Sequence, residues 1–223
     1  MSVCALVPIK DVTRAKTRLR AVLSKHDTAF LAEQMANLTI DTLTRSTSVG
    51  RIVLLGSSRG VASTAEEFGC EFASENPSQD LSANLHAAAS SLGLHANDTL
   101  AIFPADIPLI TATDVDDLIE RHEQGLTLCP AARDGGTNAL LLTPPTAIEF
   151  QFGHDSARRH AEAARAAGLP VRIIDSPVFS RDIDVPEDLD WLSRARHAGP
   201  LLDALRRQGI LPRISDPQTA LSA

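Results

Sequence analysis

The chain has 223 residues, of which 43% are hydrophobic and 22% charged, and its formal net charge is −7. This acidic balance argues against non-specific binding to nucleic acid or to an anionic membrane surface, so we expect neither partner. The longest apolar runs have the length of strands, which argues against a transmembrane span. The apolar run after Met1 has no basic flank, and we interpret it as a strand and not as a signal peptide.

The cysteines and histidines show no pattern typical of a metal centre. The three cysteines lie far apart beside apolar stretches, without a Cys-x-x-Cys pair, and the seven histidines show no His-Glu-x-x-His spacing. Isolated cysteines of this kind are typical of buried, reduced thiols. We therefore expect a cytoplasmic protein without a zinc site.

Strand-like and helix-like segments alternate along the chain, because short apolar runs predict strands and amphipathic or alanine-rich runs predict helices. The first half predicts a strand at 3–7, a helix at 28–45 capped by Asp27, a strand at 51–55, a short helix ending near 68, a strand at 70–73, a helix at 81–92 and a strand at 100–103. The second half predicts a helix capped by Thr113, strands at 126–132 and 138–142, a helix at 156–167, a strand at 171–174, a helix at 186–196 and a short helix after 200.

This alternation predicts an α/β fold of three layers, in which helices cover both faces of a mostly parallel sheet. The glycines at 135 and 136 indicate a turn with antiparallel pairing beside it, so the sheet should be mixed. A chain of this length forms one domain, or one domain with a small appendage. We assign residues 1–198 to the domain and residues 199–223 to a C-terminal extension that is not a separate domain.

Two acidic positions are candidates for a metal site. Asp106 ends an apolar run, and Asp182 and Asp184, two residues apart, face the same way in an extended segment. Ligands of doubly wound sheets bind at the carboxyl ends of strands, and three converging carboxylates suit magnesium and phosphates. The alternative is structural: Asp106 closes a turn with Pro108, and Asp184 caps a helix that starts at Pro186. Taken together, the three positions favour the metal site.

A basic segment follows the first strand and stands out against the acidic composition. Lys10, Arg14, Lys16 and Arg18 place four cations within nine residues. Lysine and arginine at this edge of a sheet suit a polyphosphate, and the alternative is a solvated helix start. The segment contains neither the Gly-x-x-x-x-Gly-Lys of a P-loop nor a Gly-x-Gly-x-x-Gly dinucleotide motif.

Three later segments are candidate binding loops. Asp-Gly-Gly-Thr-Asn at 134–138 lets the backbone approach a ligand, with a plain hairpin turn as the alternative. Phe-Gly-His-Asp-Ser at 152–156 opens a helix, so Gly153 and Ser156 can offer amides and a hydroxyl to an anion, with an ordinary helix cap as the alternative. The helix start at 80–85 is a weaker candidate for nucleoside contacts.

In this order, these segments resemble the guanylyltransferases of deazaflavin coenzyme F(420) biosynthesis, which act on 2-phospholactate, phosphoenolpyruvate or 3-phosphoglycerate. The Asp-Gly-Gly-Thr-Asn and Asp-Ile-Asp-x-Pro-Glu-Asp-Leu blocks are the most specific. Further matches are Val-Pro-Ile-Lys at 7–10, Pro-Ala-Asp-Ile-Pro-Leu at 104–109, and Phe-Gly at 152–153 with Ser156. The resemblance runs to about residue 192 and implies a nucleotidyltransferase fold of the glycosyltransferase-A, Rossmann-like type.

The resemblance implies transfer of GMP from GTP to a small phosphorylated carboxylic acid, with pyrophosphate released and Mg²⁺ as cofactor. It leaves a homodimer open and implies a downstream deazaflavin transferase that receives the product. The implied magnesium ligands are Asp106, Asp182 and Asp184; the groups at the phosphates are Lys10, Arg14, Lys16 and Arg18; nucleotide contacts include Pro8, Lys10, Lys16, Asn84 and Pro104; and the acid is held by Thr137, Asn138, Gly153 and Ser156.

Two departures from the family pattern and two alternatives stay open at this point. Relatives often have Gly-Leu-Asn where this chain has Asp-Leu-Ser at 80–82, and smaller residues where it has His154-Asp155. The alternatives are another nucleotidyltransferase of the same fold, of the cytidylyl or molybdopterin type, and a catalytically inactive nucleotide-binding module. The intact aspartates and basic segment favour an active enzyme.

Overall fold

The computed structural model describes residues 2–10, 16–194 and 199–211. Its strands are β1 (Val3–Pro8), β2 (Arg51–Gly56), β3 (Glu71–Ser74), β4 (Thr99–Ile102), β5 (Gly125–Pro130), β6 (Thr137–Thr143) and β7 (Val171–Ile173). Its helices are the 3-10 turn η1 (Thr17–Ala21), α1 (Lys25–Arg45), α2 (Arg59–Phe68), α3 (Leu81–Ser91), α4 (Ala112–Glu120), α5 (Ser156–Ala166), α6 (Pro186–Arg194) and α7 (Gly199–Arg207). No helix in these ranges is both long enough and apolar enough to cross a membrane.

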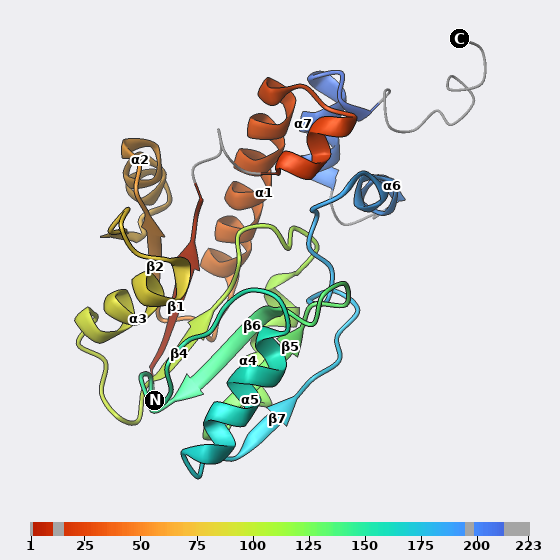
Figure 1. The fold of residues 1–223 in the computed structure, drawn as a ribbon. Helices are drawn as coiled ribbons and strands as arrows, with labels where there is room; N and C mark the ends of the chain where they lie inside the picture. Colours follow the sequence, from red (N-terminus) through yellow and green to blue (C-terminus); the bar gives the residue numbers. More distant parts are fainter. Residues whose placement is uncertain (1, 11–15, 195–198, 212–223) are drawn as a thin grey trace.

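The seven described strands form one mixed sheet in the order β3-β2-β1-β4-β6-β5-β7 (Figure 1). Strand β6 runs antiparallel to both of its neighbours, β4 and β5, and the remaining pairs are parallel. The expected mixed sheet is thereby confirmed. Because β6 is reversed, its first residues lie at the same sheet edge as the carboxyl ends of the parallel strands.

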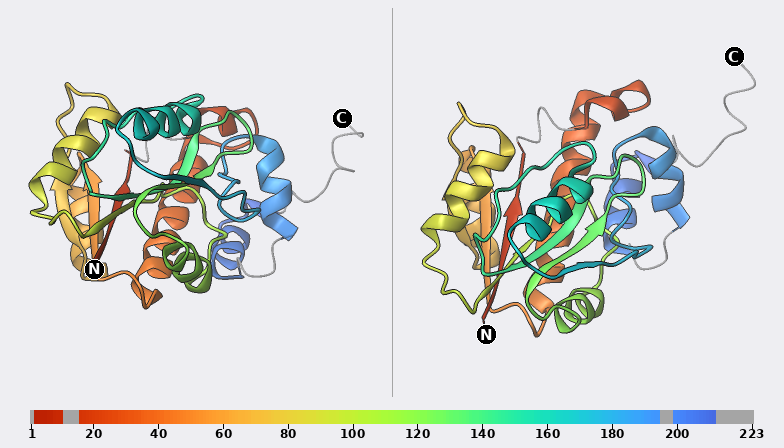
Figure 2. Two further views of the ribbon diagram at one scale, coloured as in Figure 1. Left: turned by 90° about the horizontal axis from the view of Figure 1, so that it is seen from below. Right: turned by 60° about the horizontal axis from the view of Figure 1, so that its bottom comes forward.

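Helices cover both faces of the sheet, as the two views of Figure 2 show, and the three-layer α/β/α architecture is confirmed. Side chains of β1 alternate between the faces: Val3, Ala5 and Val7 pack in one core, while Cys4 and Leu6 pack in the other. The first core includes apolar residues of α1, α2 and α4, and the second includes those of α3 and α5. Both faces of β1 are therefore buried, which explains its unbroken apolar sequence.

A third apolar cluster lies beside the sheet and is built mainly from helices. Leu19 of η1, Leu31 and Met35 of α1, Leu189 of α6 and Leu205 of α7 are all buried in it. Figure 1 shows α7 lying against α1, close to α6. The extension after residue 198 thus packs on the segment that follows β1, whose lysine and arginine side chains enter the site described below.

Two predicted helix caps are wrong. Helix α1 begins three residues earlier than expected, because Ser24 accepts a hydrogen bond from the amide of Asp27 and is itself the cap. Helix α4 is capped by Thr111 and not by Thr113. The Thr111 hydroxyl accepts a hydrogen bond from the Asp114 amide, and the Asp114 carboxylate accepts one from the Thr111 amide. The predicted strands are all present, with ends shifted by a residue or two.

The cysteines match the expectation of free thiols. Cys4 and Cys129 are fully buried and Cys70 is partly buried, and all three are free. Burial raises the pKa of Cys4 to about 11 and that of Cys129 to about 12, so these thiols stay protonated.

Candidate active site

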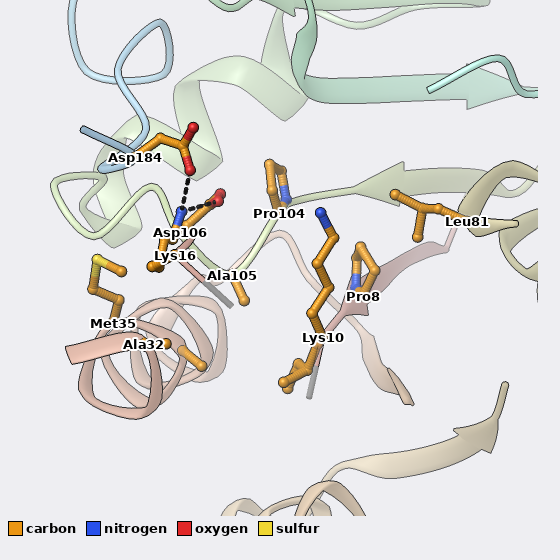
Figure 3. Close-up of a pocket in the computed structure, with 12 residues that line it drawn as sticks. Pro8, Lys10, Lys16, Ala32, Met35, Leu81, Pro104, Ala105, Asp106 and Asp184 are labelled. Atoms are coloured by element: carbon orange, nitrogen blue, oxygen red, sulfur yellow. Dashed lines mark hydrogen bonds and ion pairs between the residues drawn. The ribbon is translucent and has the colours of Figure 1, made fainter. Parts of the chain in front are cut away.

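A cleft opens where the sheet topology changes direction, between the carboxyl ends of β1 and β4. This is the position at which α/β sheets bind ligands. Strand β1 pairs with β2 on one side and with β4 on the other. After β1 the chain continues to β2 on the first side, and after β4 it continues to β5 on the opposite side of the sheet. The cleft is shown in Figure 3 and is lined by Pro8, Ile9, Lys10, Lys16, Ala32, Met35, Ala36, Leu81, Pro104, Ala105, Asp106 and Asp184.

Lys16 lies between two of the three predicted metal ligands. Its Nζ is 2.6 Å from Asp106 Oδ2 and 3.7 Å from Asp184 Oδ1 (Figure 3). The lysine side chain is only 7% exposed. Its backbone has φ 54°, a left-handed conformation that is uncommon outside glycine. The fold therefore accepts an unfavourable backbone conformation where it brings this ammonium group to the carboxylates.

The charges of this cluster shift the pKa of each member. Burial acts to lower the pKa of Lys16, but the neighbouring Asp106 carboxylate, helped by Asp184 and Asp182, outweighs burial and raises it. Burial acts to raise the pKa of Asp106, and the Lys16 charge and hydrogen bond reverse this effect and lower it. Burial, followed by repulsion from Asp106, raises the pKa of Asp182. The cluster is thus an anionic site that Lys16 and Arg18 partly neutralise.

Hydrogen bonds from distant segments hold the second acidic position in place. The amide of Ile183 donates to the backbone carbonyl of Asp106 at 3.1 Å, which joins the two acidic segments directly. The amides of Asp184 and Val185 both donate to Asp188 Oδ2, at 2.8 and 2.9 Å. Asp188 also pairs with Arg133. The segment that carries Asp184 is therefore held through its backbone amides, which donate to Asp106 and Asp188.

This geometry decides against the structural alternative for Asp184. Its carboxylate contacts Lys16 and Arg18, with Lys16 Nζ 3.7 Å from Asp184 Oδ1 and Arg18 Nη1 3.0 Å from Asp184 Oδ2. The carboxylate that accepts the backbone amides before α6 is that of Asp188. Asp184 is thus available to a ligand in a way that a capping side chain is not.

The donor chemistry of the cluster fits a hard divalent cation, although the side chains are not gathered around one point. Three carboxylates with oxygen donors suit Mg²⁺. Within the described ranges, no three histidine, cysteine, aspartate or glutamate side chains converge closely enough to hold an ion as they stand. Lys16 lies between Asp106 and Asp184 instead. Binding of a cation by these aspartates would require the lysine to withdraw.

The other residues predicted at the nucleotide divide into three groups. Pro8, Lys10 and Pro104 line the cleft, and the exposed Lys10 side chain extends beside Pro8 (Figure 3). Arg14 lies outside the described residues. Asn84 is placed differently from the prediction, because its side chain is buried and its amide makes four hydrogen bonds to the loop at 76–80. This geometry supports a role for Asn84 in shaping that loop and not a direct nucleotide contact.

The residues predicted for the acid come together at the start of β6 and of α5. Ile102 of β4 pairs with Leu140, so Thr137 lies three residues further along, at the edge where Asp106 is found. Thr137 Oγ1 is 2.9 Å from Ser156 Oγ, and both residues are buried. Asn138 is also buried, and its Nδ2 has no partner among the described residues. The four predicted residues thus share one region, with only Gly153 exposed.

Ser156 is not presented to solvent as the sequence suggests. It is completely buried, and its amide donates to the carbonyl of Gly153. The amides of Asp155 and Ala157 likewise donate to the carbonyls of Asp134 and Gly135. These bonds fold the loop at 152–155 onto the glycine loop at 134–136 and occupy the amides at the start of α5.

Four further residues organise the site: Asp188 and Ser82 lie inside motifs already recognised in the sequence but without an assigned role, and Arg133 and His160 were not predicted. Asp188 and Arg133 join the glycine loop to the Asp184 segment. Ser82 accepts a hydrogen bond of 2.9 Å from the amide of Phe152, which ties the α3 start to the second binding loop. His160 bonds to Thr137. A local signal could have found His160, since it lies four residues after Ser156 and so on the same helix face.

Comparisons with known proteins show the family to which the chain belongs. Residues 3–194 match a family model described as "Guanylyl transferase CofC like". The chain is 39% identical to the phosphoenolpyruvate guanylyltransferase of Roseiflexus sp. strain RS-1, over 87% of this chain and 86% of that one. It is 32% identical to the 2-phospho-L-lactate guanylyltransferase of Methanothermobacter thermautotrophicus, over 92% of each chain. It is 33% identical to the 3-phospho-D-glycerate guanylyltransferase of Colwellia psychrerythraea, over 84% of this chain and 90% of that one.

Solved structures show the same fold. The crystal structure of a putative nucleotide-diphospho-sugar transferase from Desulfovibrio desulfuricans G20 superimposes with a TM-score of 0.74 at 17% identity, over 96% of this chain and 99% of that one. At this identity the likeness concerns the fold alone, which is that of nucleotidyltransferases, as expected. The match of the family model across the whole described sheet shows that the chain belongs to the CofC-like guanylyl transferases.

Proposed function

We propose that this protein transfers GMP from GTP to the phosphate of a small phosphorylated carboxylic acid and releases pyrophosphate, in the biosynthesis of deazaflavin coenzyme F(420). The supporting observation is the position of Lys16 between Asp106 and Asp184, at the sheet edge where β1 and β4 part, in a chain of the CofC-like family. Carboxylates that can bind a cation lie beside cationic side chains that can bind phosphates. This arrangement suits transfer between two phosphate-bearing substrates.

The reaction needs alignment and charge neutralisation more than acid–base chemistry. An oxygen of the acid's phosphate is already anionic, so it can attack the α-phosphorus of GTP without a base. The new P–O bond forms as the bond from the α-phosphorus to the bridging oxygen breaks, and the electron pair leaves with pyrophosphate. Lys10, Lys16 and Arg18 would hold the triphosphate in line and balance its charge. Arg14, outside the described residues, has the same expected role.

Asp106, Asp182 and Asp184 are the proposed magnesium ligands. The bound cation would supply neutralisation of the phosphate charge as the leaving group departs. In the described conformation Lys16 serves as the counter-charge of Asp106 and Asp184. We therefore expect that Lys16 turns from the carboxylates to the phosphates when magnesium and GTP arrive together.

The identity of the acid is left to experiment. The three relatives are named for phosphoenolpyruvate, 2-phospho-L-lactate and 3-phospho-D-glycerate. Thr137, Asn138, Gly153 and Ser156 are the proposed contacts of the acid, and His154 and Asp155 border them. The product would pass to a deazaflavin transferase in the cytoplasm.

The test is pyrophosphate release from the purified protein, measured with each of four nucleoside triphosphates and each of the three acids in the presence of magnesium. We expect release with GTP and at least one acid, and little release without the acid. Asp106→Asn should abolish it while the thermal melt stays close to that of the wild type. Release with CTP and not GTP, or none with any pair, would refute the proposal.

A further inference from the structure

A buried histidine lies beneath the proposed acid site and contacts both segments that form it. His160 of α5 is completely buried. Its Nδ1 is 3.1 Å from Thr137 Oγ1 at the start of β6, and its Nε2 is 2.8 Å from the backbone nitrogen of Gln151. The imidazole ring also meets the ring of Phe152 edge to face, with 4.9 Å between centroids. One side chain therefore joins β6 to the loop before α5.

These contacts give the hydrogen bonds a direction. The amide of Gln151 can only donate, so Nε2 of His160 accepts and the ring proton is on Nδ1. Nδ1–H then donates to Thr137 Oγ1. Ser156 Oγ, at 2.9 Å, is the acceptor that the described residues offer to the Thr137 hydroxyl. One of the two lone pairs of Ser156 Oγ is thereby occupied, and the hydroxyl hydrogen of Ser156 points elsewhere.

The ionisation state of His160 agrees with this arrangement. Burial, followed by the nearby charge of Arg159, lowers the pKa of His160 to about 4. The ring is therefore neutral at physiological pH, with one nitrogen that donates and one that accepts. A protonated ring would place two donors face to face at Gln151.

We propose that His160 is a positioning residue for the acid substrate. It orients the hydroxyls of Thr137 and Ser156 so that each donates its hydrogen to the next group in the chain. The hydrogen of the last hydroxyl, that of Ser156, is then directed towards an anionic group of the acid. Carboxylates and phosphates accept hydrogen bonds and do not donate them, so a chain that ends in a hydroxyl hydrogen is the complement they require. The proposal rests on the proposed function, because it takes these two hydroxyls as contacts of the acid. His160 itself need not touch the substrate.

The chain ends just inside the surface. Ser156 is buried, and its amide is bonded to the carbonyl of Gly153, which is exposed. The acid therefore reaches the Ser156 hydroxyl when the loop at 152–154 shifts. Gly153 has φ 122°, a conformation that side chains rarely adopt, and glycine can leave it easily.

A second histidine provides a matched control at the other edge of the sheet. His122 is also buried, with Nδ1 2.9 Å from Thr127 Oγ1 and Nε2 3.0 Å from Thr143 Oγ1. Burial, followed by the charge of Arg172, lowers its pKa to about 4 as well. His122 thus resembles His160 in burial, partners and ionisation, but it lies beside the N-terminal end of β5, away from the cleft.

The tautomer can be tested without any substrate. Nitrogen-15 NMR of the ring in the full-length wild-type protein should show a neutral His160 with its proton on Nδ1. A proton on Nε2 would overturn the inference, whatever the enzymatic activity. Conversely, a wild-type protein that uses none of the acids would refute the proposed function and leave the tautomer result intact.

Kinetics test the positioning role through the ratio of the KM for the acid to the KM for GTP. His160→Gln keeps an acceptor near the Nε2 position but loses the donor to Thr137, and should raise this ratio roughly tenfold, about the effect of one lost hydrogen bond to a charged group. His160→Asn keeps a donor near the Nδ1 position and should raise the ratio less. His122→Gln should lower the melting temperature without changing the ratio.

An unchanged ratio in His160→Gln, equal ratios in the glutamine and asparagine variants, or the same rise in His122→Gln would each overturn the proposal. If His160→Gln does not fold, Thr137→Val tests the same chain, because it removes the hydroxyl between His160 and Ser156 and keeps the side-chain shape. Thr137→Ser, which restores the hydroxyl, should return the ratio towards the wild-type value. An unchanged ratio in Thr137→Val would then count against the proposal.

Discussion

At the scale of single residues, Lys16 is the residue on which the charge balance of the site depends. Its ammonium group compensates Asp106 and Asp184, and the charge of Asp182 also acts on it. Removing one member of a fully buried ion pair costs about 3–5 kcal/mol, and the cost is smaller here because the Asp106 and Asp184 side chains are 33% and 30% exposed to solvent. The same lysine is the group that a magnesium ion would have to replace.

We therefore predict that Lys16→Gln destabilises the protein when magnesium is absent and that magnesium restores part of the loss. The added cation would supply the charge that the lysine no longer provides, whereas in the wild type it has to displace the lysine first. Thermal melts with and without magnesium check this, with the exposed Lys25 as a control in Lys25→Gln. A magnesium-induced shift no larger in Lys16→Gln than in the wild type would contradict the prediction.

At the scale of elements, α6 positions Asp184, a proposed magnesium ligand, through Asp188. This carboxylate accepts hydrogen bonds from the amides of Asp184 and Val185 and pairs with Arg133, which precedes the glycine loop.

We predict that Asp188→Asn lowers turnover by about tenfold or more and lowers the melting temperature, because an amide cannot replace a carboxylate at all three contacts. Turnover at saturating substrates is the measurement. Asp190→Asn, at an exposed position of the same helix, should behave like the wild type.

Helix α7 supports the same region from the far side. Leu205 is fully buried in the cluster that also holds Leu19 of η1 and Ile183, the residue between Asp182 and Asp184. The family model ends at residue 194, before this helix.

We predict that Leu205→Ala lowers the free energy of unfolding by about 2–5 kcal/mol. We also predict that it raises the KM for GTP, because it loosens the segment that carries Lys16 and Arg18. Denaturant unfolding and steady-state kinetics check both effects. A chain truncated after residue 194 with unaltered stability would contradict this role of α7.

At the scale of the whole molecule, the reversal of β6 makes the two sheet edges different. The start of β6 joins the site through Thr137, and its end joins a buried polar network in which His122 contacts Thr143 and Thr143 contacts Thr99. Strands β4, β5 and β6 are thus tied together by side chains at the edge opposite the cleft. Burial lowers the pKa of His122 and so favours the neutral imidazole in this network.

We predict that stability falls as pH decreases from about 6.5 to about 4. The folded-state pKa of His122 is lowered to about 4 from a usual value of 6.5, so within this window the unfolded chain binds more protons. Each such histidine contributes at most about 1.4 kcal/mol per pH unit. His160 has a similar pKa and adds to the slope. Urea unfolding across this window should show a smaller slope in His122→Gln than in the wild type. Equal slopes would contradict the prediction.

The amino-acid sequence alone determined the local features of this protein. The short apolar runs predicted the strands, and the position of Asp106 after β4 followed from them. The order of the motifs indicated the family. The caps of α1 and α4 were misjudged because each region offers two residues able to cap, and packing selects the turn at which the helix begins.

Only the tertiary structure decided how the charged and polar side chains meet. Lys16 and Asp106 are 90 positions apart in the chain, and no local pattern shows that a lysine predicted to face phosphates would pair with the aspartates predicted to bind the metal. Burial of Ser156, the use of Asn84 by its own loop and the direction set by His160 also arise from contacts between separate segments. The physical reason is that periodicity determines which face of an element is apolar, whereas hydrogen bonds and ion pairs depend on distances that exist only once those faces have packed.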